Sequence, residues 1–484
     1  MKAWFVPPAG LPALNILSAL TFAGAGMFLF FAMGWLYFDS PVAILGFGAA
    51  LSAIAILTVR KADSIALRFP GGDAHPLRAL WIIMAVGAAL RIGWVIAVPP
   101  IQVSDFKDYT DAARQWLDTG TYSYVVRGHT LYACRPPGYP MFLMAFMAAL
   151  GDRWWLATVI NMLLFLASAW MGYRTALLLT GNRNTGLWAA ALLALWPSTI
   201  ACAGMAASEP LSLVLFIAVF WAYAEADRRA GTARGLGLAA VAGLVIGFGA
   251  LVKPQMQMLP FLLGLAWLAA TRGKLPKAAN AAVAVVAMVL AIAPWAVRNY
   301  HQFGGRYLAI SSNGGDVFYR ANNPLATGDY TVVGEKSLDP YLDDELVWSK
   351  TGFAWGKEWI RSHPVDFVKL GVKKVARFLG DDASSMYWTL VRGHGNKGAA
   401  YQALVILSNA YWCLVWILAL AGVAKFRKAI FASDMYGLFL WMTLFFVVAH
   451  SIFESHSRYH LPMLAFLAIL AAMGLSRPAP APTK

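Results

Sequence analysis

Charged residues are scarce in this chain, and acidic residues are the scarcer kind. Only 13% of the 484 residues are charged, against about a quarter in soluble domains, while 60% are hydrophobic. The mean hydropathy is +0.59, which excludes a soluble globular protein. The 39 Lys and Arg outnumber the 24 Asp and Glu, for a formal charge of +15. Because most basic residues flank apolar runs, this balance indicates membrane topology rather than nucleic-acid binding.

Cysteines are few, and several nucleotide, metal and hydrolase motifs are lacking. Cys134, Cys202 and Cys413 are too scattered for a disulfide framework or a zinc site. The sequence contains no Walker loop, dinucleotide-binding glycine fingerprint, HExxH or GxSxG. These absences argue against a transporter with its own ATPase domain and against a zincin. No cofactor and no metal site is predicted, and the use of a divalent cation is left open.

Long apolar runs recur along the chain. A run of about 20 apolar residues crosses a bilayer once as a helix, and about twelve such runs occur. They lie near residues 15–38, 42–59, 79–98, 155–173, 187–204, 210–224, 236–252, 257–271, 279–297, 401–424, 435–452 and 460–475. The expected fold is therefore an all-α polytopic membrane protein with about twelve transmembrane helices.

The positions of Lys and Arg predict which connections face the cytoplasm. Alternate connections are basic, for example 60–78, 228–234 and 425–428, and cytoplasmic loops carry such an excess. Both termini are therefore predicted to be cytoplasmic. Residues 99–154 and 299–400 fall on the outer side, where long loops translocate largely regardless of their charge.

Both outer loops contain segments that suit the membrane surface. Pro137 to Gly151 is apolar, but about 15 residues at about 1.5 Å each are shorter than the roughly 30 Å hydrocarbon core. We therefore expect this segment to lie along the outer interface. Phe353 to Leu379 mixes aromatic and basic residues around Pro364, which predicts an amphipathic interfacial helix with an interruption.

These segments divide the chain into five expected parts. They are two N-terminal transmembrane helices (1–78), a transmembrane core that includes the first outer loop (79–298, loop 99–154), the large outer loop (299–400), C-terminal transmembrane helices (401–476) and a disordered cytoplasmic tail (477–484).

The first outer loop opens with acidic residues at a spacing of three. Asp105, Asp108 and Asp111 would share one face of a helix, and Asp105 follows the outer end of a membrane span by a few residues. The spacing also fits a solvated helix start with Asp105 as its N-cap. At headgroup depth, however, such a carboxylate suits a general base, a metal ligand or a hydrogen-bond acceptor.

Arg135 precedes a proline pair near the end of the same loop. Pro136 and Pro137 restrict the backbone and hold Arg135 on a stiff extended segment. The guanidinium fork matches phosphate oxygens, which favours contact with a lipid phosphate. Ordinary snorkelling to headgroups is the competing interpretation.

Ionisable residues also lie at the outer ends of other spans. Each alone fits snorkelling or capping, but groups in this position are costly and often functional. Arg91 lies inside its span, where it either pairs with an acidic neighbour or reaches outward. The groups at the outer ends are Glu209, Lys253, Arg298, Glu454, His456, Arg458, Tyr459 and His460.

The order of these motifs resembles that of the bacterial GT-C glycosyltransferases, the membrane class that holds protein O-mannosyltransferases and the lipid A aminoarabinose transferase. The resemblance runs from about Trp81 to Gly474. Members often carry an Asp-Glu pair where this chain has Asp105-Phe106, and the two helices before residue 78 look additional. The shared motifs are Ser104-Asp105-Phe106 with Tyr109, RPPGYP (Arg135–Pro140), SEP (Ser208–Pro210), PWAVRN (Pro294–Asn299), NGG (Asn313–Gly315), NNPLATG (Asn322–Gly328) and RYHLP (Arg458–Pro462).

The resemblance implies transfer of a hexose or pentose from a polyprenyl-phosphate donor, such as undecaprenyl phosphate, with inversion. The acceptor would be a lipid, polysaccharide or protein on the periplasmic side of the bacterial inner membrane. Asp105 is then the expected catalytic base, with Asp108 as the alternative. Arg135, Lys253, Arg298 and Arg458 are expected to bind the donor phosphate, and the expected substrate contacts are Tyr139, Glu209, Asn322, Glu454, His456 and Tyr459.

Two other functions fit parts of this pattern. An O-antigen polymerase or ligase also has a large outer loop with arginines, but it uses a diphosphate-linked glycan. A transporter or flippase can have as many helices, but it places polar groups at mid-membrane and often shows internal repeats. The donor distinguishes the three functions, since it is monophosphate-linked, diphosphate-linked or absent.

Overall fold

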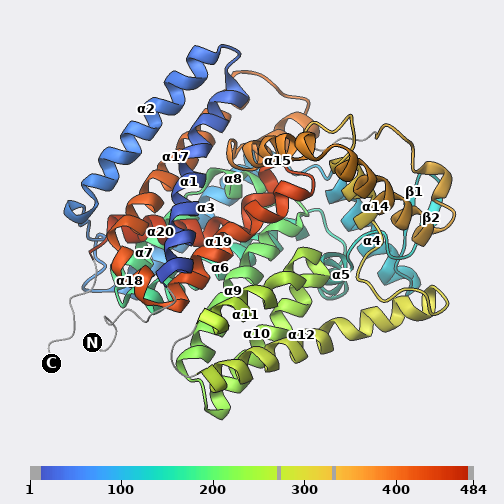
Figure 1. Ribbon diagram of the computed structural model, residues 1–484, viewed down its shortest axis with the longest axis horizontal. Helices are drawn as coiled ribbons and strands as arrows, with labels where there is room; N and C mark the ends of the chain where they lie inside the picture. Colours follow the sequence, from blue (N-terminus) through green and yellow to red (C-terminus); the bar gives the residue numbers. More distant parts are fainter. Residues whose placement is uncertain (1–11, 270–273, 330–333, 478–484) are drawn as a thin grey trace.

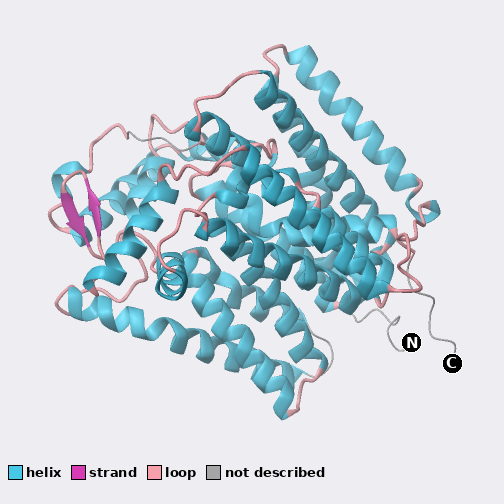
Figure 2. Cartoon of the chain, turned by 180° about the vertical axis from the view of Figure 1, so that it is seen from behind, coloured by secondary structure: helices cyan, strands magenta, loops and turns pink. Residues whose placement is uncertain are grey.

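The computed structural model describes residues 12–269, 274–329 and 334–477. Most of these residues are helical (Figures 1 and 2). Within the described residues, the strands are limited to one antiparallel hairpin of β1 (Tyr124–Val126) and β2 (His129–Leu131). Of the expected tail, 477–484, all but Arg477 lies outside the described residues.

Ten described helical segments are long and apolar enough to cross a membrane. The segment from α7 (Arg183–Ala194) to α8 (Pro197–Ala201) and η3 (Cys202–Gly204) is bent by 50° at a short break, and it makes an eleventh span if the two halves are counted as one. The remaining predicted run, 257–271, contains α11 (Leu259–Ala269), and its last two residues lie outside the described residues. The ten are α1 (Pro12–Tyr37), α2 (Pro41–Arg60), α3 (Pro76–Ala97), α6 (Leu156–Thr180), α9 (Ser208–Arg228), α10 (Ala233–Val252), α12 (Lys274–Gln302), α17 (Ala399–Lys425), α19 (Asp434–Ile452) and η7 with α20 (Ser457–Met463, Leu464–Leu475).

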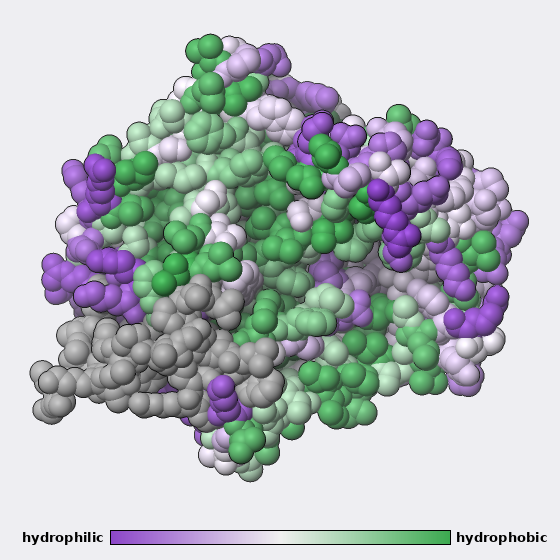
Figure 3. Space-filling model, in the orientation of Figure 1, coloured by the Kyte–Doolittle hydropathy of each residue, from purple (hydrophilic) through white to green (hydrophobic). Residues whose placement is uncertain are grey.

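The chain is thus an all-α, multi-pass membrane protein, as predicted. Helices predominate because a bilayer offers no partner for a free backbone N–H or C=O group. Residues on α2 remain exposed to the surroundings of the bundle, with Val42 79% and Leu45 62% exposed. Figure 3 shows such apolar surface over the spans, while polar residues gather beside it over the outer loops near α14.

Helix α20 lies at the centre of the bundle, and all twelve of its residues are buried. Its contact with α17 depends on two glycines. A Cβ atom at Gly422 would lie 2.0 Å from the carbonyl oxygen of Leu470, and one at Gly474 would lie 2.3 Å from that of Leu418. Glycine therefore lets the two backbones approach, as is common between membrane helices.

The two long loops that the sequence predicts on the outer side fold together at one end of the bundle, where α4, α5, α14 and the hairpin lie close together in Figure 1. The predicted interruption at Pro364 is confirmed, since α14 ends at Ser362 and α15 begins at Pro364. The helical elements of these two loops are α4 (Asp105–Thr119), α5 (Gly138–Leu150), α13 (Gly314–Ala321), η5 (Asp339–Tyr341), α14 (Glu345–Ser362), α15 (Pro364–Leu379), α16 (Ser384–Met386) and η6 (Tyr387–Gly393). Short segments elsewhere are η2 (Ala62–Ser64), η4 (Pro254–Met258) and α18 (Arg427–Ala432).

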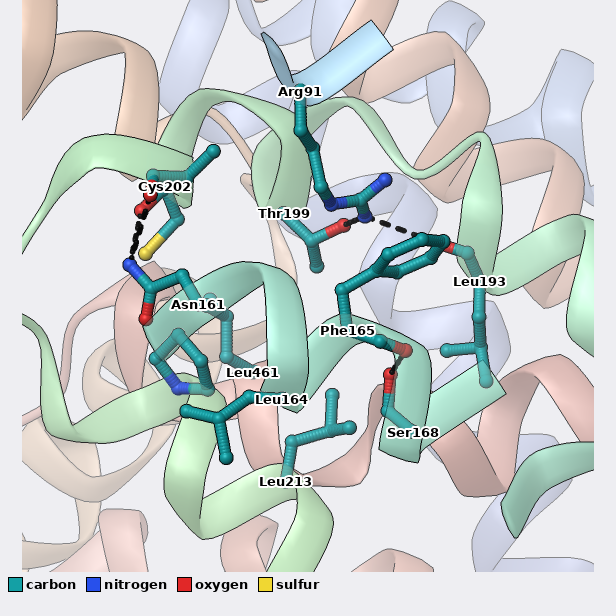
Figure 4. Close-up of a pocket in the computed structure, with 12 residues that line it drawn as sticks. Arg91, Asn161, Leu164, Phe165, Ser168, Leu193, Thr199, Cys202, Leu213 and Leu461 are labelled. Atoms are coloured by element: carbon teal, nitrogen blue, oxygen red, sulfur yellow. Dashed lines mark hydrogen bonds between the residues drawn. The ribbon is translucent and has the colours of Figure 1, made fainter. Parts of the chain in front are cut away.

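Arg91 on α3 takes neither of the roles expected for it (Figure 4). Its guanidinium group donates to the carbonyl oxygens of Ala194 at 2.9 Å and Leu193 at 3.4 Å, and to Thr199 Oγ1 at 2.7 Å. It lies 3.7 Å from the ring centre of Phe165. The carbonyl groups at the end of α7 lack partners within their helix, so Arg91 stabilises the bend. The adjacent cavity, about 30 Å³, is too small for a lipid or a sugar.

Candidate active site

The acidic residues of the first outer loop begin α4. Ser104, rather than Asp105, occupies the N-cap position, with φ of 52°. Asp105 faces the bundle with 20% of its side chain exposed, and Asp108 is 45% exposed. Asp111 instead forms exposed ion pairs within its own helix. The spacing of three therefore places two of the three carboxylates in one polar cluster.

Arg135 joins these two carboxylates. Its Nη1 lies 2.9 Å from Asp105 Oδ1, and its Nη2 lies 2.8 Å from Asp108 Oδ2. The guanidinium carbon is 5.8 Å from the ring centres of both Tyr109 and Tyr124. One planar fork thus spans two acids while its faces pack near aromatic rings.

Arg458 binds the other oxygen of Asp105 from the opposite end of the sequence. Its Nη2 donates to Asp105 Oδ2 and, at 3.4 Å, to the hydroxyl of Tyr459. The rings of Trp388 and Phe106 lie 5.7 and 5.8 Å from its guanidinium carbon. Each carboxylate oxygen of Asp105 therefore has its own guanidinium partner.

A second ion pair lies beside this cluster. Lys253 Nζ, directly after α10, donates to Glu209 Oε1 at 2.8 Å, and only 16% and 4% of the two side chains are exposed. Lys253 Nζ also lies 5.5 Å from the ring centre of Tyr459. The hydroxyl of Tyr459 donates to Glu454 Oε1 at 2.7 Å. Tyr459 therefore connects the second pair to Arg458.

The two candidate bases differ in their electrostatics. Burial opposes the ionisation of Asp105, but Arg458 and Arg135 outweigh it and hold the pKa of Asp105 well below its usual range. Burial raises the pKa of Asp108 above its usual value, and Arg135 only partly offsets this. A carboxylate with a strongly depressed pKa accepts protons poorly. Asp105 would therefore become a better base if the two guanidinium groups moved to another anion.

Asp105, Arg458, Tyr459 and His456 line one cavity of about 660 Å³. This volume is in the range of sites for small organic ligands. His456 Nδ1 lies 3.2 Å from the hydroxyl oxygen of Ser384, which is the first residue of α16 and also lines the cavity. A further group of lining residues was not predicted from the sequence, and its members are Tyr37, Asp329, Asp381, Tyr387, Trp388, Arg392 and Tyr401. Only Asp381 had a recognisable signal, since it follows an interfacial helix as Asp105 follows a span.

Arg298 is placed away from this cavity. Its guanidinium group donates to the carbonyl oxygens of Tyr132 at 2.7 Å and Tyr122 at 3.0 Å. The carboxylate of Glu345 accepts hydrogen bonds from the backbone N–H groups of Tyr132 at 2.7 Å and Ala133 at 2.9 Å. Arg298 and Glu345 thus hold the backbone that leads to Arg135, rather than joining the ion-pair cluster.

Asn322 and Tyr139 are also buried outside the cavity lining. Asn322 Oδ1 accepts a hydrogen bond from Lys374 Nζ at 2.9 Å, and its amide donates to the carbonyl oxygen of Ile452 at 3.1 Å. Tyr139 packs edge-on against Tyr109, with ring centres 5.2 Å apart. Its hydroxyl has no hydrogen-bond partner among the described residues. The structure thus gives Asn322 a role in loop packing and places Tyr139 behind Tyr109.

No protein-family model matches the sequence, and no curated protein matches it either. Solved structures do match. The archaeal oligosaccharyltransferase AglB from Archaeoglobus fulgidus, in complex with an inhibitory peptide and a dolichol-phosphate, has a TM-score of 0.52 at 12% identity. The same enzyme tethered with an acceptor peptide has a TM-score of 0.53 at 13% identity. Each match covers 84% of this chain and 50% of AglB.

ArnT from Cupriavidus metallidurans, bound to undecaprenyl phosphate, also matches, with 16% identity over 90% of this chain and 79% of ArnT. Its TM-score is 0.35. The chain spans about half the length of AglB, and at such low identity the likeness concerns the fold. On that likeness, this chain has the GT-C membrane fold, the fold of the oligosaccharyltransferase AglB.

Proposed function

We propose that this protein transfers a sugar from a polyprenyl-monophosphate donor to an acceptor on the outer side of the membrane. One observation carries the proposal: Arg135 and Arg458 converge on Asp105 at the wall of the outer cavity. Two guanidinium groups at that depth suit a lipid phosphate, and a carboxylate between them suits an acceptor hydroxyl. The fold adds support, because the AglB structure of the same fold holds a dolichol-phosphate.

In the proposed reaction, the donor phosphate takes the place of Asp105 between the two arginines. The bond between the anomeric carbon and the phosphate oxygen breaks, and the phosphate gains a second negative charge. Arg135, Arg458 and the nearby Lys253 stabilise this charge, because their positions are set before the reaction begins. Glu209 orients Lys253 through their ion pair.

The acceptor hydroxyl attacks the anomeric carbon from the face opposite the phosphate, which inverts the configuration. Its proton passes to Asp105. Once Arg135 and Arg458 pair with the phosphate, the pKa of Asp105 rises from its depressed value, because those two cations are what lower it. Donor binding therefore prepares the base. Asp108, whose pKa burial already raises, is the alternative proton acceptor.

The proposed setting is the bacterial inner membrane, with the cavity toward the periplasm. The proposed donor lipid is undecaprenyl phosphate, the sugar is a hexose or pentose, and the acceptor is a lipid, polysaccharide or protein. Residues 79–298 and 401–476 form the proposed catalytic membrane core, residues 299–400 form the proposed acceptor-side loop, and residues 1–78 are additional to that core.

The test uses the purified full-length chain in lipid nanodiscs. Short-chain polyprenyl monophosphates carrying mannose, glucose, galactose or arabinose are supplied with a membrane fraction as the acceptor source, and released polyprenyl phosphate is measured. Transfer from a monophosphate donor supports the proposal, and its loss in Arg458→Gln but not in Asp152→Asn assigns the site. Transfer only from a diphosphate-linked glycan would indicate a polymerase or ligase. Transport without transfer would indicate a flippase.

A further inference from the structure

The N-terminal helix α1 reaches the wall of the outer cavity. Tyr37, its last residue, lines the cavity together with Asp381, which follows α15. Helix α1 packs against α15, α17 and α19. The approach to Asp381 is close, since a Cβ atom at Gly380 would lie 2.8 Å from Leu36 Cδ1 and 2.9 Å from the carbonyl carbon of Ala32. The helix is therefore fitted to the turn that carries Asp381.

Asp381 is held in the cavity wall by neutral donors. The hydroxyl of Tyr37 donates to Asp381 Oδ1 at 2.5 Å, and Asn409 Nδ2 donates to the same oxygen at 3.2 Å. Asn409 also donates to the Tyr37 hydroxyl at 2.8 Å, which fixes the direction of the tyrosine proton. Ser457 Oγ donates to Asp381 Oδ2 at 2.8 Å. Among the described residues, no cation is paired with this carboxylate, in contrast to Asp105.

The lone side-chain donor at Asp381 Oδ2 leaves this oxygen able to accept another hydrogen bond, since a carboxylate oxygen has two acceptor sites. Ser457 directly precedes Arg458 in the chain, so Asp381 lies next to the proposed phosphate position. A sugar attached to that phosphate would lie within reach of Asp381. Trp388 lines the same cavity and offers an apolar ring to the C–H face of a sugar.

We infer that Asp381, positioned by Tyr37, accepts a hydrogen bond from a hydroxyl group of the donor sugar and selects its stereochemistry. This inference rests on the proposed function and extends it. Helix α1 then contributes to the choice of sugar, although it belongs to the segment expected to be additional to the catalytic core.

The experiment compares Asp381→Asn and Tyr37→Phe with wild type. The donors are short-chain polyprenyl monophosphates carrying glucose, mannose or galactose, which differ in single hydroxyl orientations, or arabinose. The matched control is Asp152→Asn, because Asp152 forms an ion pair with Arg114 on the outer surface and does not line the cavity. The kcat/KM for each donor and the affinity for sugar-free polyprenyl phosphate are measured.

Wild type should favour one epimer, and Asp381→Asn should reduce that preference by about tenfold or more, the worth of one hydrogen bond to a charged group. Tyr37→Phe should reduce it in the same direction and by less, because the ring stays in place. Neither variant should change the affinity for sugar-free polyprenyl phosphate, and Asp152→Asn should match wild type in both measurements.

The inference is overturned if wild type shows no preference among epimers, or if both folded variants keep it. It is also overturned if the two variants weaken binding of the sugar-free lipid, because Asp381 would then act on the phosphate site. If Asp381→Asn does not fold, Tyr37→Phe decides. If wild type transfers no sugar from any of these donors, the proposed function itself is contradicted, and no donor sugar remains for Asp381 to bind.

Discussion

Replacing Asp105 by Asn should tighten the binding of polyprenyl phosphate while abolishing most of the turnover. The carboxylate of Asp105 binds both guanidinium groups that the phosphate is proposed to use. Asn has the same shape, but it carries no charge and has one acceptor oxygen instead of two. The variant therefore competes less with the phosphate, yet it cannot take the acceptor's proton.

The size of the effect follows from these contacts. The substitution removes one charge-assisted hydrogen bond and weakens the other, and each is worth about 1.5 to 3 kcal/mol. With 20% of the Asp105 side chain exposed, solvent screens these contacts only in part. One lost contact corresponds to a dissociation constant about 10- to 150-fold lower for polyprenyl phosphate. Turnover should fall by at least about 10²-fold, the usual contribution of a general base.

The assay combines isothermal titration of polyprenyl phosphate with steady-state transfer rates. Because the pKa of Asp105 is held well below its usual range, the carboxylate stays ionised throughout the working pH range. Asp111→Asn is the matched control, since Asp111 lies on the same helix but pairs with Lys107 and Arg114 at the surface. Unchanged or weaker phosphate binding by Asp105→Asn would refute the proposal that the phosphate replaces Asp105 between the two arginines. Normal turnover would show that Asp105 is not the general base.

Three further predictions concern stability and topology. Arg91→Leu should lower the free energy of unfolding by about 1 to 3 kcal/mol, because buried carbonyl groups such as that of Ala194 lose their donor. An unchanged melting temperature would contradict this prediction. Burial lowers the pKa of Lys374 from 10.5 to about 7. Between about pH 7 and 10.5 the unfolded chain therefore binds more protons than the folded chain, so the free energy of unfolding should rise with pH in this range. Thermal melts at about pH 7 to 10 should show this rise in wild type and not in Lys374→Met. A cysteine introduced near Gly328, but not one near Gly231, should be labelled from outside intact cells, and the reverse result would invert the topology.

The membrane spans were predictable because the bilayer demands long apolar helices, and that demand is local in sequence. The bent span between α7 and α8 was less visible. Its stability depends on Arg91, which reaches carbonyl groups more than 100 positions away in the sequence. Neither expected role for Arg91 considered a helix break as its partner, because sequence alone does not locate such a break relative to another span.

The candidate site was predictable as a set of residues but not as a set of pairs. Asp105 and Arg458 stood out because each is ionisable at an outer helix end, yet 353 positions separate them. Asp381 follows a helix as Asp105 does, but its partners come from three separate helical elements, so its place in the site could not be predicted from the sequence. Arg298 differs from both, since its guanidinium group holds the loop backbone at Tyr132 and Tyr122, a contact that sequence alone does not reveal.

The contact between Asp105 and Arg458 also has a consequence for the biogenesis of the protein. A ribosome must add 353 residues after Asp105 before the second guanidinium group exists. Earlier helices enter the bilayer first, since synthesis proceeds from the N-terminus. The nascent chain therefore carries an incomplete charge cluster until the span that begins at Ser457 is inserted, and any product truncated before that span would lack the second guanidinium partner of Asp105.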